Sequence, residues 1–292
     1  GLDDLEQSII DHLKELHFKK DDPDPLLPTS SSRVAIIGKP NVGKSSLVNA
    51  FLSEPEQKKG GVLVSDIPGT TRDSVDTVVK YHDQEFIFTD TAGLKRKSKT
   101  QSGIDTFAAL RSIQSMENCD ITVLVLDATQ EISKQDKRIA GMAVDEGKGL
   151  IILVNKIDLL ESGKKAEVLE NVAKEFQFCK FAPILPVSAE SKEGLLKIFD
   201  QIEMVERNRS RRLETKDLRR WYEDSLAGQP LAAVKSKHIT QAADLPPTFV
   251  LFVKDPKKVQ VSQLRYLDNS LRKTFGFEGT PVRWVTKVSS SG

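Results

Sequence analysis

The stretch VAIIGKPNVGKSSLVN, residues 34–49, decides the fold of this chain. Its first four residues are apolar and predict a buried strand, and GKPNVGKS (38–45) matches the pattern GxxxxGK followed by Ser or Thr. Glycines in such a loop let backbone N–H groups curl around phosphate oxygens, and the following helix adds the field of its N-terminus. We expect Lys44 to reach the β- and γ-phosphates of a nucleotide and Ser45 to offer its hydroxyl to Mg²⁺.

Apolar strands alternate with helical stretches from residue 33 to about residue 205. The strands that follow the quoted stretch are predicted in EFIFTD (85–90), ITVLVLD (121–127), GLIILVNK (149–156) and APILPVSA (182–189). Strands that are apolar at nearly every position and are separated by helices are typical of a parallel sheet that helices cover on both faces. We therefore expect an α/β domain with a mostly parallel sheet over residues 33–205.

Polar motifs follow these strands in a fixed order. In DTAG (90–93), we expect Asp90 to hold Mg²⁺ through water and the Gly93 N–H to sense the γ-phosphate. In NKID (155–158), the carboxylate of Asp158 can accept hydrogen bonds from guanine N1–H and its 2-amino group, whereas adenine would leave that charge unpaired. The order of the motifs therefore predicts a site for GTP or GDP in preference to ATP.

Two further segments complete the predicted site. Ser188-Ala189 follows a strand and is placed to give a backbone N–H to guanine O6. GTTRD (69–73) is expected to carry a threonine to Mg²⁺ only when the γ-phosphate is present; we favour Thr71, with Thr70 as the alternative and a plain turn as the other interpretation. The Mg²⁺ ligands are then Ser45, Thr71 and Asp90. The predicted nucleotide-binding residues are Gly38, Asn41, Val42, Gly43, Lys44, Ser45, Ser46, Asn155, Lys156, Asp158, Ser188 and Ala189.

The sequence outside the motifs predicts an N-terminal helix with a linker and argues against a membrane or secreted protein. Residues 2–16 place leucines and isoleucine three and four apart, which predicts one amphipathic helix, and the prolines and serines of residues 21–32 predict a linker. No apolar run approaches the ~18 residues of a membrane span, and no secretory signal is visible, so we expect a cytoplasmic protein without a membrane partner. Cys119 and Cys179 are expected to be buried free thiols.

The C-terminal region, residues 206–288, has a different pattern and charge. It predicts a small α+β domain with an antiparallel or mixed sheet, with helices near 215–227 and 262–275 and strands at 248–254 and 281–288. Residues 205–292 hold 17 Lys+Arg against 9 Asp+Glu, whereas residues 1–204 hold 26 against 33. This surplus indicates either a module that faces nucleic acid or a solvated basic face.

Basic, aromatic and glycine residues of this region are the candidates for RNA contact. The basic linker and the helix after it contribute Arg207, Arg209, Arg211, Arg212, Arg219 and Arg220. Trp221, Tyr222 and Trp284 offer stacking surfaces, although we favour membership of an apolar core for all three. GFEG (276–279) has the form of the GxxG loop of KH domains, but its place between a helix and a strand favours helix termination.

These motifs together carry a family resemblance that covers nearly the whole chain. GKPNVGKSSLVN, SDIPGTTRD, DTAGL, NKID and VSA resemble the G domain of the Era-like GTPases, and PPTFVLF and FGFEGTP are similar to the C-terminal KH-like domain of the Der (EngA) family of tandem GTPases. The resemblance implies a second G domain over 33–205, a KH-like domain over 206–288, and residues 1–20 as the last helix of an absent first G domain, with which the chain makes an intramolecular contact. It also implies a role in large ribosomal subunit assembly, with the KH-like domain and the basic linker docked on rRNA.

Hydrolysis of GTP by this chain would need a group that orients the attacking water molecule. Leu94 follows DTAG where Ras-type switches have a glutamine, and leucine has no group to orient water. Related GTPases with an asparagine in the phosphate loop use a monovalent cation, so the resemblance implies that Asn41 helps to hold K⁺. The candidate catalytic residues are Lys44, Thr71, Gly93 and Asn41. Basic residues of the stretch 95–99 would add charge to the transition state, contact RNA or merely solvate a loop.

Two functions remain open on the sequence, with a weaker third. The first is a GTP-hydrolysing switch that controls docking on rRNA. The second is a ribosome- or RNA-binding module that holds guanine nucleotide structurally with negligible turnover. A regulator of RNA modification is the third, and the block TFVLF with FGFEGTP argues against it. The stretch 229–249 is shorter than the family pattern, which leaves one β-strand of the C-terminal domain open.

Overall fold

The stretch that opens the fold forms the predicted strand, loop and helix. The computed structural model describes residues 32–51, 53, 63–68, 75–81, 84–89, 115–228 and 238–288. Within them, β1 (Ser32–Ile37) runs into the phosphate loop, and α2 (Lys44–Phe51) follows it directly. The helix expected in residues 2–16 lies outside the described residues. All of these described residues belong to one compact unit.

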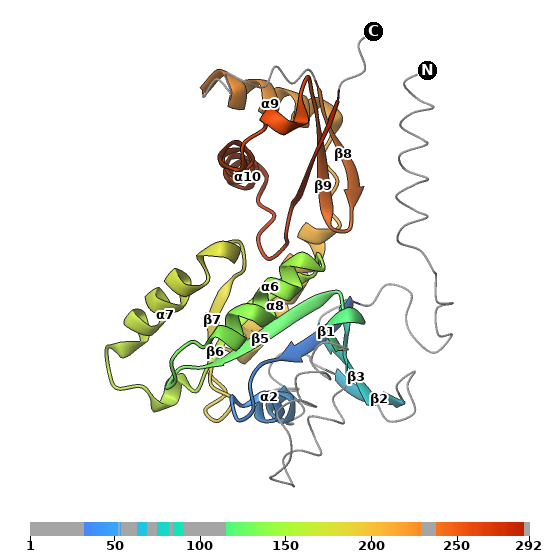
Figure 1. Ribbon diagram of the computed structural model, residues 1–292. Coiled ribbons are helices and arrows are strands. Elements are labelled where there is room, and N and C mark those ends of the chain that lie inside the picture. Colours follow the sequence, from blue (N-terminus) through green and yellow to red (C-terminus); the bar gives the residue numbers. More distant parts are fainter. Residues whose placement is uncertain are drawn as a thin grey trace. The chain divides into compact units, whose positions relative to one another are not determined.

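A seven-stranded sheet carries the first part of the chain (Figure 1). Its order is β2 (Leu63–Pro68), β3 (Val75–Tyr81), β4 (Gln84–Phe88), β1, β5 (Ile121–Asp127), β6 (Gly149–Asn155) and β7 (Ile184–Pro186). The strands from β4 to β7 pair in parallel, while β2 and β3 pair antiparallel at one side. Every residue of β5 and β6 is buried, as the continuous apolar runs predicted. The mostly parallel sheet is thus confirmed.

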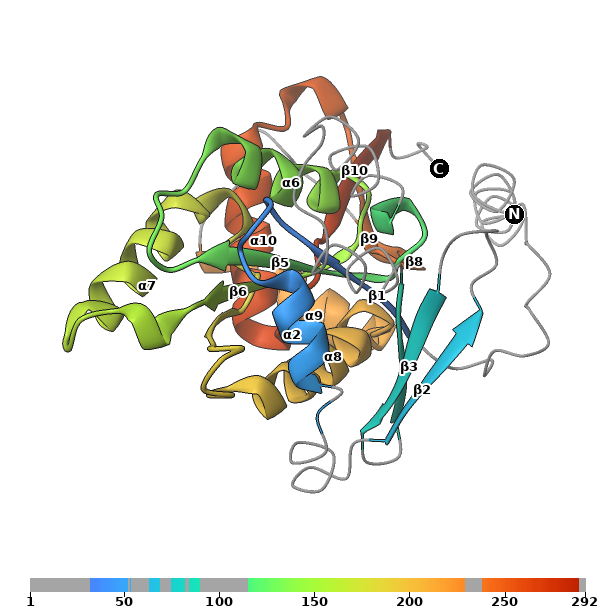
Figure 2. The same ribbon diagram turned by 90° about the horizontal axis from the view of Figure 1, so that it is seen from below.

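Helices cover both faces of this sheet (Figure 2). Alternate residues of β1 point to opposite faces, so that Val34 and Ile36 join one core and Ala35 and Ile37 the other. The first core contains the apolar sides of α2 and α8 (Leu195–Arg209), and the second contains those of α6 (Lys134–Asp145) and α7 (Lys164–Glu175). In folds of this kind, ligands bind at the carboxyl ends of the parallel strands.

A three-stranded mixed sheet follows in the last part of the chain. The helices and strands of this part of the chain are α9 (Thr215–Gly228), β8 (His238–Asp244), β9 (Pro247–Val253), α10 (Val261–Phe275) and β10 (Arg283–Val288). The strand order is β10-β9-β8, with β8 antiparallel and β10 parallel to β9, so the mixed sheet is confirmed. β8 lies in the stretch that the sequence left open. Trp221 and Tyr222 are buried in the core of this domain, and Trp284 packs against that core.

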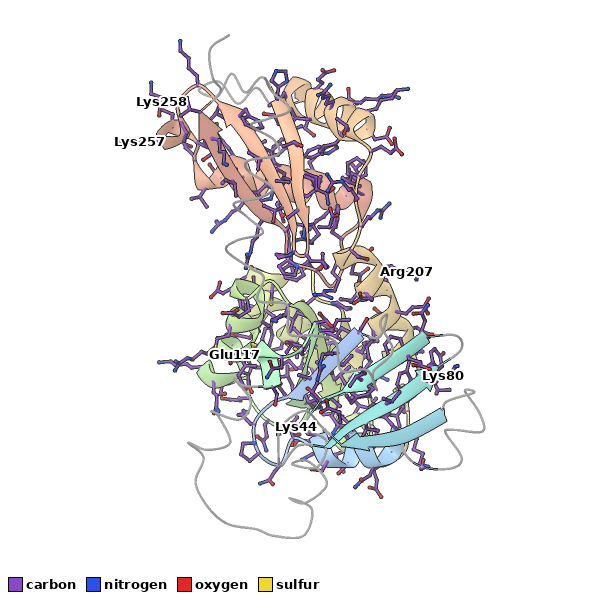
Figure 3. The ribbon with its side chains drawn as sticks, turned by 90° about the vertical axis from the view of Figure 1, so that its right-hand side faces the viewer. Lys44, Lys80, Glu117, Arg207, Lys257 and Lys258 are labelled. Atoms are coloured by element: carbon purple, nitrogen blue, oxygen red, sulfur yellow. The ribbon has the colours of Figure 1, made fainter. Side chains whose placement is uncertain are left out.

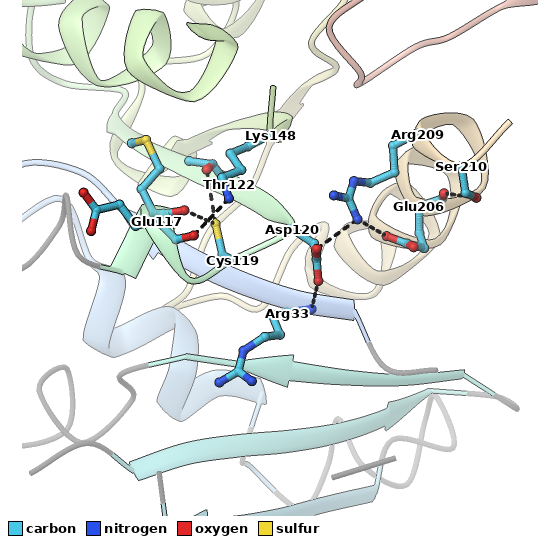
Figure 4. Close-up of polar contacts among 10 residues, drawn as sticks. Arg33, Glu117, Cys119, Asp120, Thr122, Lys148, Glu206, Arg209 and Ser210 are labelled. Atoms are coloured by element: carbon cyan, nitrogen blue, oxygen red, sulfur yellow. Dashed lines mark hydrogen bonds and ion pairs between the residues drawn. The ribbon is translucent and has the colours of Figure 1, made fainter. Parts of the chain in front are cut away.

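Arg209, one of the arginines predicted to contact RNA, is instead paired with carboxylates of the protein (Figure 4). Arg209 at the end of α8 is 8% exposed, and its guanidinium lies 3.1 Å from Asp120 and 3.3 Å from Glu206. Asp120 also accepts a hydrogen bond from the Arg33 backbone N–H, at 2.9 Å. The cluster joins the start of β1 and the residue before β5 to the end of α8. Arg209 is therefore not available to an RNA phosphate in this structure.

The two cysteines agree with the prediction from the sequence. Cys119 and Cys179 are both free and buried, as predicted. Burial raises the pKa of the Cys179 thiol to about 12 and raises that of Cys119 as well. Among the helices that the structure describes, none is long and apolar enough to cross a membrane.

Candidate nucleotide-binding site

The lysine of the phosphate loop folds back onto the loop's own backbone. Lys44 begins α2 (Figure 3). Its ammonium group donates hydrogen bonds to the carbonyl oxygens of Gly38, at 2.8 Å, and of Lys39. The Leu47 N–H closes the first turn on Gly43 O at 2.9 Å. The lysine side chain therefore reaches back across the loop to its first two residues.

Asn155 ties the phosphate loop to the two predicted base-reading segments. Its side chain is 1% exposed, donates from Nδ2 to Val42 O at 2.8 Å and accepts at Oδ1 from the Ala189 N–H at 3.1 Å. Gly43 makes this approach possible, because a Cβ there would lie 2.2 Å from Asn155 Nδ2. Residues 42, 155 and 189 are far apart in the sequence but meet at the carboxyl ends of β1, β6 and β7. The structure thus brings the described residues of the phosphate loop, NKID and Ser188-Ala189 together.

The base-reading residues differ in how available they are. Asp158 lies in a short 3-10 helix (Ile157–Leu159) and is exposed, so its carboxylate can meet a ligand. Ser188 is fully buried, and its N–H donates to Glu193 O at 3.0 Å. The Ala189 N–H is engaged with Asn155, so a guanine O6 at this place would share that donor with Asn155 or replace it. Donation to O6 therefore stays a prediction.

Two buried carboxylates join the site without having been predicted from the sequence. Asp136 of α6 is 1% exposed and forms an ion pair of 2.9 Å with Lys39 of the phosphate loop. Asp127 at the end of β5 forms one of 2.6 Å with Lys156. The sequence contained a signal for Asp136, because Ser133 and Asp136 form a capping box at the start of α6. Asp127 had no such signal, since an aspartate at a strand end is common in turns.

The remaining predicted residues divide into described and undescribed ones. In the phosphate loop, Asn41 is exposed with a left-handed backbone (φ 64), Val42 is buried, and Ser46 is exposed. Ser45 lies in the first turn of α2, and its hydroxyl oxygen is of the type that Mg²⁺ prefers. The residues that lie outside the described part of the chain are Thr70, Thr71, Asp90, Gly93 and Leu94, with the basic stretch 95–99.

Two family models match this chain. Residues 33–156 match the model described as "50S ribosome-binding GTPase". Residues 212–287 match the model described as "KH-domain-like of EngA bacterial GTPase enzymes, C-terminal". Both parts of the fold described above thus have counterparts in known families.

Curated proteins named GTPase Der are similar to the chain over most of its length. That of Natranaerobius thermophilus is 42% identical over 282 residues, which are 94% of this chain and 61% of the relative. That of Agathobacter rectalis is 40% identical over 294 residues, 98% of this chain and 64% of the relative. That of Desulforudis audaxviator is 45% identical over 258 residues, 86% and 58%. The chain therefore spans less than two thirds of the length of these relatives.

Proposed function

We propose, because the chain belongs to the GTPase Der (EngA) family, that it binds guanine nucleotide and hydrolyses GTP to GDP and phosphate. The observation that carries the proposal is the bridge made by Asn155, which holds the phosphate loop and the base-reading segments in one arrangement. A phosphate loop alone would fit many nucleotides. The carboxylate of Asp158 is exposed beside that bridge. It favours guanine, because it can accept hydrogen bonds from guanine N1–H and from the 2-amino group at the same time.

The proposed mechanism is direct attack of water on the γ-phosphate without a covalent intermediate. Lys44 exchanges its two carbonyl partners in the loop for β- and γ-phosphate oxygens, and N–H groups of the loop and of Gly93 receive the remaining charge. Mg²⁺, which Ser45, Thr71 and Asp90 would hold, neutralises phosphate charge when bound. Asn41 would help to hold K⁺ beside the loop. Leu94 offers no group to a water molecule, so turnover by the chain alone is expected to be slow.

The proposed partner is rRNA of the large ribosomal subunit, in a cytoplasmic assembly process. Several basic side chains are exposed and suited to phosphate contact: Arg207, Lys257 and Lys258 (Figure 3), together with Arg219 and Arg220. Arg212 is exposed too, but it pairs with Asp244 at 3.0 Å. The GFEG loop is a poor candidate for clamping RNA, because Gly279 already uses both its N–H and its C=O within the protein. We therefore assign RNA contact to exposed basic side chains. Contact with a preceding G domain is part of the same proposal.

The test is GTP turnover in KCl against NaCl at equal ionic strength, with Lys44→Ala and Asn41→Ala beside the wild type. Lys44→Ala is expected to lower turnover at least about 100-fold, because it removes charge from the transition state. Stimulation by K⁺ that disappears in Asn41→Ala supports the cation-assisted site. Tight binding of GTP with no turnover in either salt, even with ribosomes present, would instead identify a module that holds its nucleotide structurally.

A further inference from the structure

Lys156, in the motif NKID (155–158), has its side chain held by a partner within the protein. Its backbone is left-handed (φ 66, ψ 32), which is uncommon for a residue other than glycine. Its ammonium group donates to Asp127 Oδ2 at 2.6 Å, and the side chain is 30% exposed. The stem of this lysine therefore starts between Asn155 and Asp158 and ends on a neighbouring strand.

The partner carboxylate is itself buried and held by hydrogen bonds. Asp127 is the last residue of β5, lies in register with Asn155 on β6, and has a side chain that is 1% exposed. Its Oδ1 accepts two hydrogen bonds from Thr129, at 2.9 Å from the backbone N–H and at 2.7 Å from the hydroxyl. The neighbouring Ala128 N–H donates to Asn155 O at 2.8 Å. Three donors thus hold both carboxylate oxygens against a strand end that is locked to the base motif.

The charge of this carboxylate persists at the pH of nucleotide binding. Burial acts to raise the pKa of Asp127, but hydrogen bonds from Lys156 and Thr129 outweigh it and lower the pKa below its ordinary value. Lys156 therefore faces a permanent negative charge at neutral pH. An ion pair with one buried partner is weak evidence for stability, because desolvation offsets much of the attraction. Its more direct consequence is the position of the lysine.

We propose that Asp127 is a positioning residue for guanine nucleotide, which holds Lys156 in place before the base arrives. The inference rests on the proposed function and assigns a further residue to the same site. A free lysine side chain samples many rotamers, and ordering it on binding weakens affinity. With Lys156 already ordered, this loss is avoided, and removing Asp127 should raise the Kd for nucleotide about 3- to 10-fold.

The experiment is a double-mutant cycle on the full chain with a fluorescent GDP analogue as the probe. Asp127→Asn removes the charge with little change in shape, Lys156→Met removes the ammonium group, and the double variant combines them. Asp127→Asn is expected to raise the Kd for the analogue and the KM for GTP by the stated factor, with kcat changed less than about twofold. In the Lys156→Met background the same change should have no further effect on Kd, because the carboxylate acts through the lysine.

A matched control separates position from general stability. Glu175 of α7 forms an ion pair with Lys137 of α6 at 2.5 Å, with both side chains more than one-third exposed, and Glu175→Gln should leave the Kd unchanged. If Asp127→Asn does not fold, Thr129→Val tests the same idea. It removes only the hydroxyl donor to Asp127 and should raise the Kd by less than about 3-fold, again only when Lys156 is present.

The outcomes distinguish the inference from the proposed function. If the wild type binds the GDP analogue and Asp127→Asn binds it equally well, the positioning role is wrong while the proposed function stands. The positioning role is equally wrong if Asp127→Asn weakens binding by the same factor with and without Lys156. If the wild type itself binds no GDP analogue, the proposed function fails, and the inference fails with it.

Discussion

The two ends of β6 hold different parts of the molecule by different means. At the carboxyl end, the Asn155 side chain bonds to Val42 O and to the Ala189 N–H. At the amino end, the Leu150 N–H donates to Gly279 O at 2.7 Å, and the Gly279 N–H donates to Phe181 O at 2.7 Å. One end is built from a specific side chain and the other from backbone groups and a glycine. The first kind of contact leaves a signature in the sequence, and the second does not.

The amino end is where the KH-like domain docks on the G domain. Gly279 has a left-handed backbone (φ +75), and a Cβ at this residue would lie 2.0 Å from Val205 Cγ2. Arg272 of α10 lies 4.6 Å above the Phe181 ring and donates to the carbonyl oxygens of Phe277 and Thr280. GFEG therefore ends α10, as predicted, and also docks the domain. We call residues 276–280 the docking loop.

The largest expected effect comes from breaking the carboxyl end with Gly43→Ala. The new Cβ would meet Asn155 Nδ2 at 2.2 Å on a backbone with φ +98, so strain and a lost hydrogen bond combine to about 3 kcal/mol. Affinity for guanine nucleotide is expected to fall about 100-fold, measured by titration with a fluorescent GDP analogue. Hydrogen exchange of the Leu150 amide at the other end should stay as in the wild type. Near-normal affinity would mean that the Asn155 bridge is not needed for binding.

The next effect comes from breaking the amino end with Gly279→Ala. We expect the free energy of unfolding to fall by about 2–3 kcal/mol, because Val205 and the backbone must both shift. The Kd for nucleotide should not change, since Leu150 and Asn155 lie about 17 Å apart along the strand. Urea unfolding and nucleotide titration together measure the two quantities.

Gly163→Ala is the matched control for this substitution. Gly163 has a similar backbone (φ +87) but nothing within 4 Å of the new Cβ, so only the backbone term of about 1 kcal/mol applies. Equal losses in the two variants would show that the contact with Val205 adds nothing and that docking does not depend on Gly279.

The same contrast explains how much could be predicted from the sequence. The motifs GKPNVGKS, NKID and SA require particular side chains, and the structure brings their described residues together. The strand β8 was left open because the stretch 229–249 is shorter than the family pattern, and an inward-facing polar residue also breaks the apolar pattern of this strand. Gln241 is 4% exposed and bonds at 2.8 Å to both the Leu213 N–H and Arg211 O. The partners of a buried amide are set by the tertiary fold, so no local pattern predicts them.

The docking loop and the pairing of Asp127 with Lys156 escaped prediction for related reasons. The GxxG pattern of residues 276–279 is consistent with a clamp, a cap or a docking segment, and only the neighbouring Phe181 and Val205 decide among these. Asp127 acquires its role from Lys156, which is 29 positions away. Both cases depend on partners that are distant in sequence.

A smaller effect is expected from Arg209→Leu, which sharpens the comparison at the amino end. Arg209 pairs with Asp120, whose carbonyl accepts from the Gly149 N–H at 2.9 Å at the start of β6. Both partner carboxylates are about one-third exposed, so we expect a loss of only about 1–2 kcal/mol in the free energy of unfolding. Thermal and urea unfolding measure it.

Arg207→Leu is the matched control for Arg209→Leu. Arg207 is exposed on the same helix, where its pair with Glu203 spans 3.6 Å, and its loss should change stability by less than about 0.5 kcal/mol. The affinity of Arg207→Leu for rRNA should fall more than the affinity of Arg209→Leu does. The loss of affinity in Arg207→Leu should be larger at low salt than at high salt. The reverse order in RNA binding would assign the buried arginine a role in RNA contact that its pairing does not suggest.

The smallest effect concerns the Cys179 thiol, which reports on the docking end. Cys179 O accepts from the Ala182 N–H at 2.9 Å, next to Phe181, and burial raises the pKa of its thiol to about 12. The neutral thiol is thus favoured in the folded state. Above the unfolded thiol's pKa of about 8.5, the unfolded chain ionises at Cys179 while the folded chain does not. The stability that the buried thiol contributes is therefore complete below about pH 8.5 and is lost as pH rises from there towards about 12.

Reaction with a disulfide reagent at pH 8 turns this into a measurement of docking. The folded wild type should react slowly, because thiolate is scarce and the group is buried, while the unfolded chain should expose both cysteines. Gly279→Ala is expected to speed the reaction of Cys179 severalfold, since the segment beside Phe181 loses its partner, whereas Gly43→Ala should leave the rate unchanged. Acceleration by Gly43→Ala alone would reverse the assignment of the two ends, because the thiol would then respond to the nucleotide end of β6 instead of the docking loop.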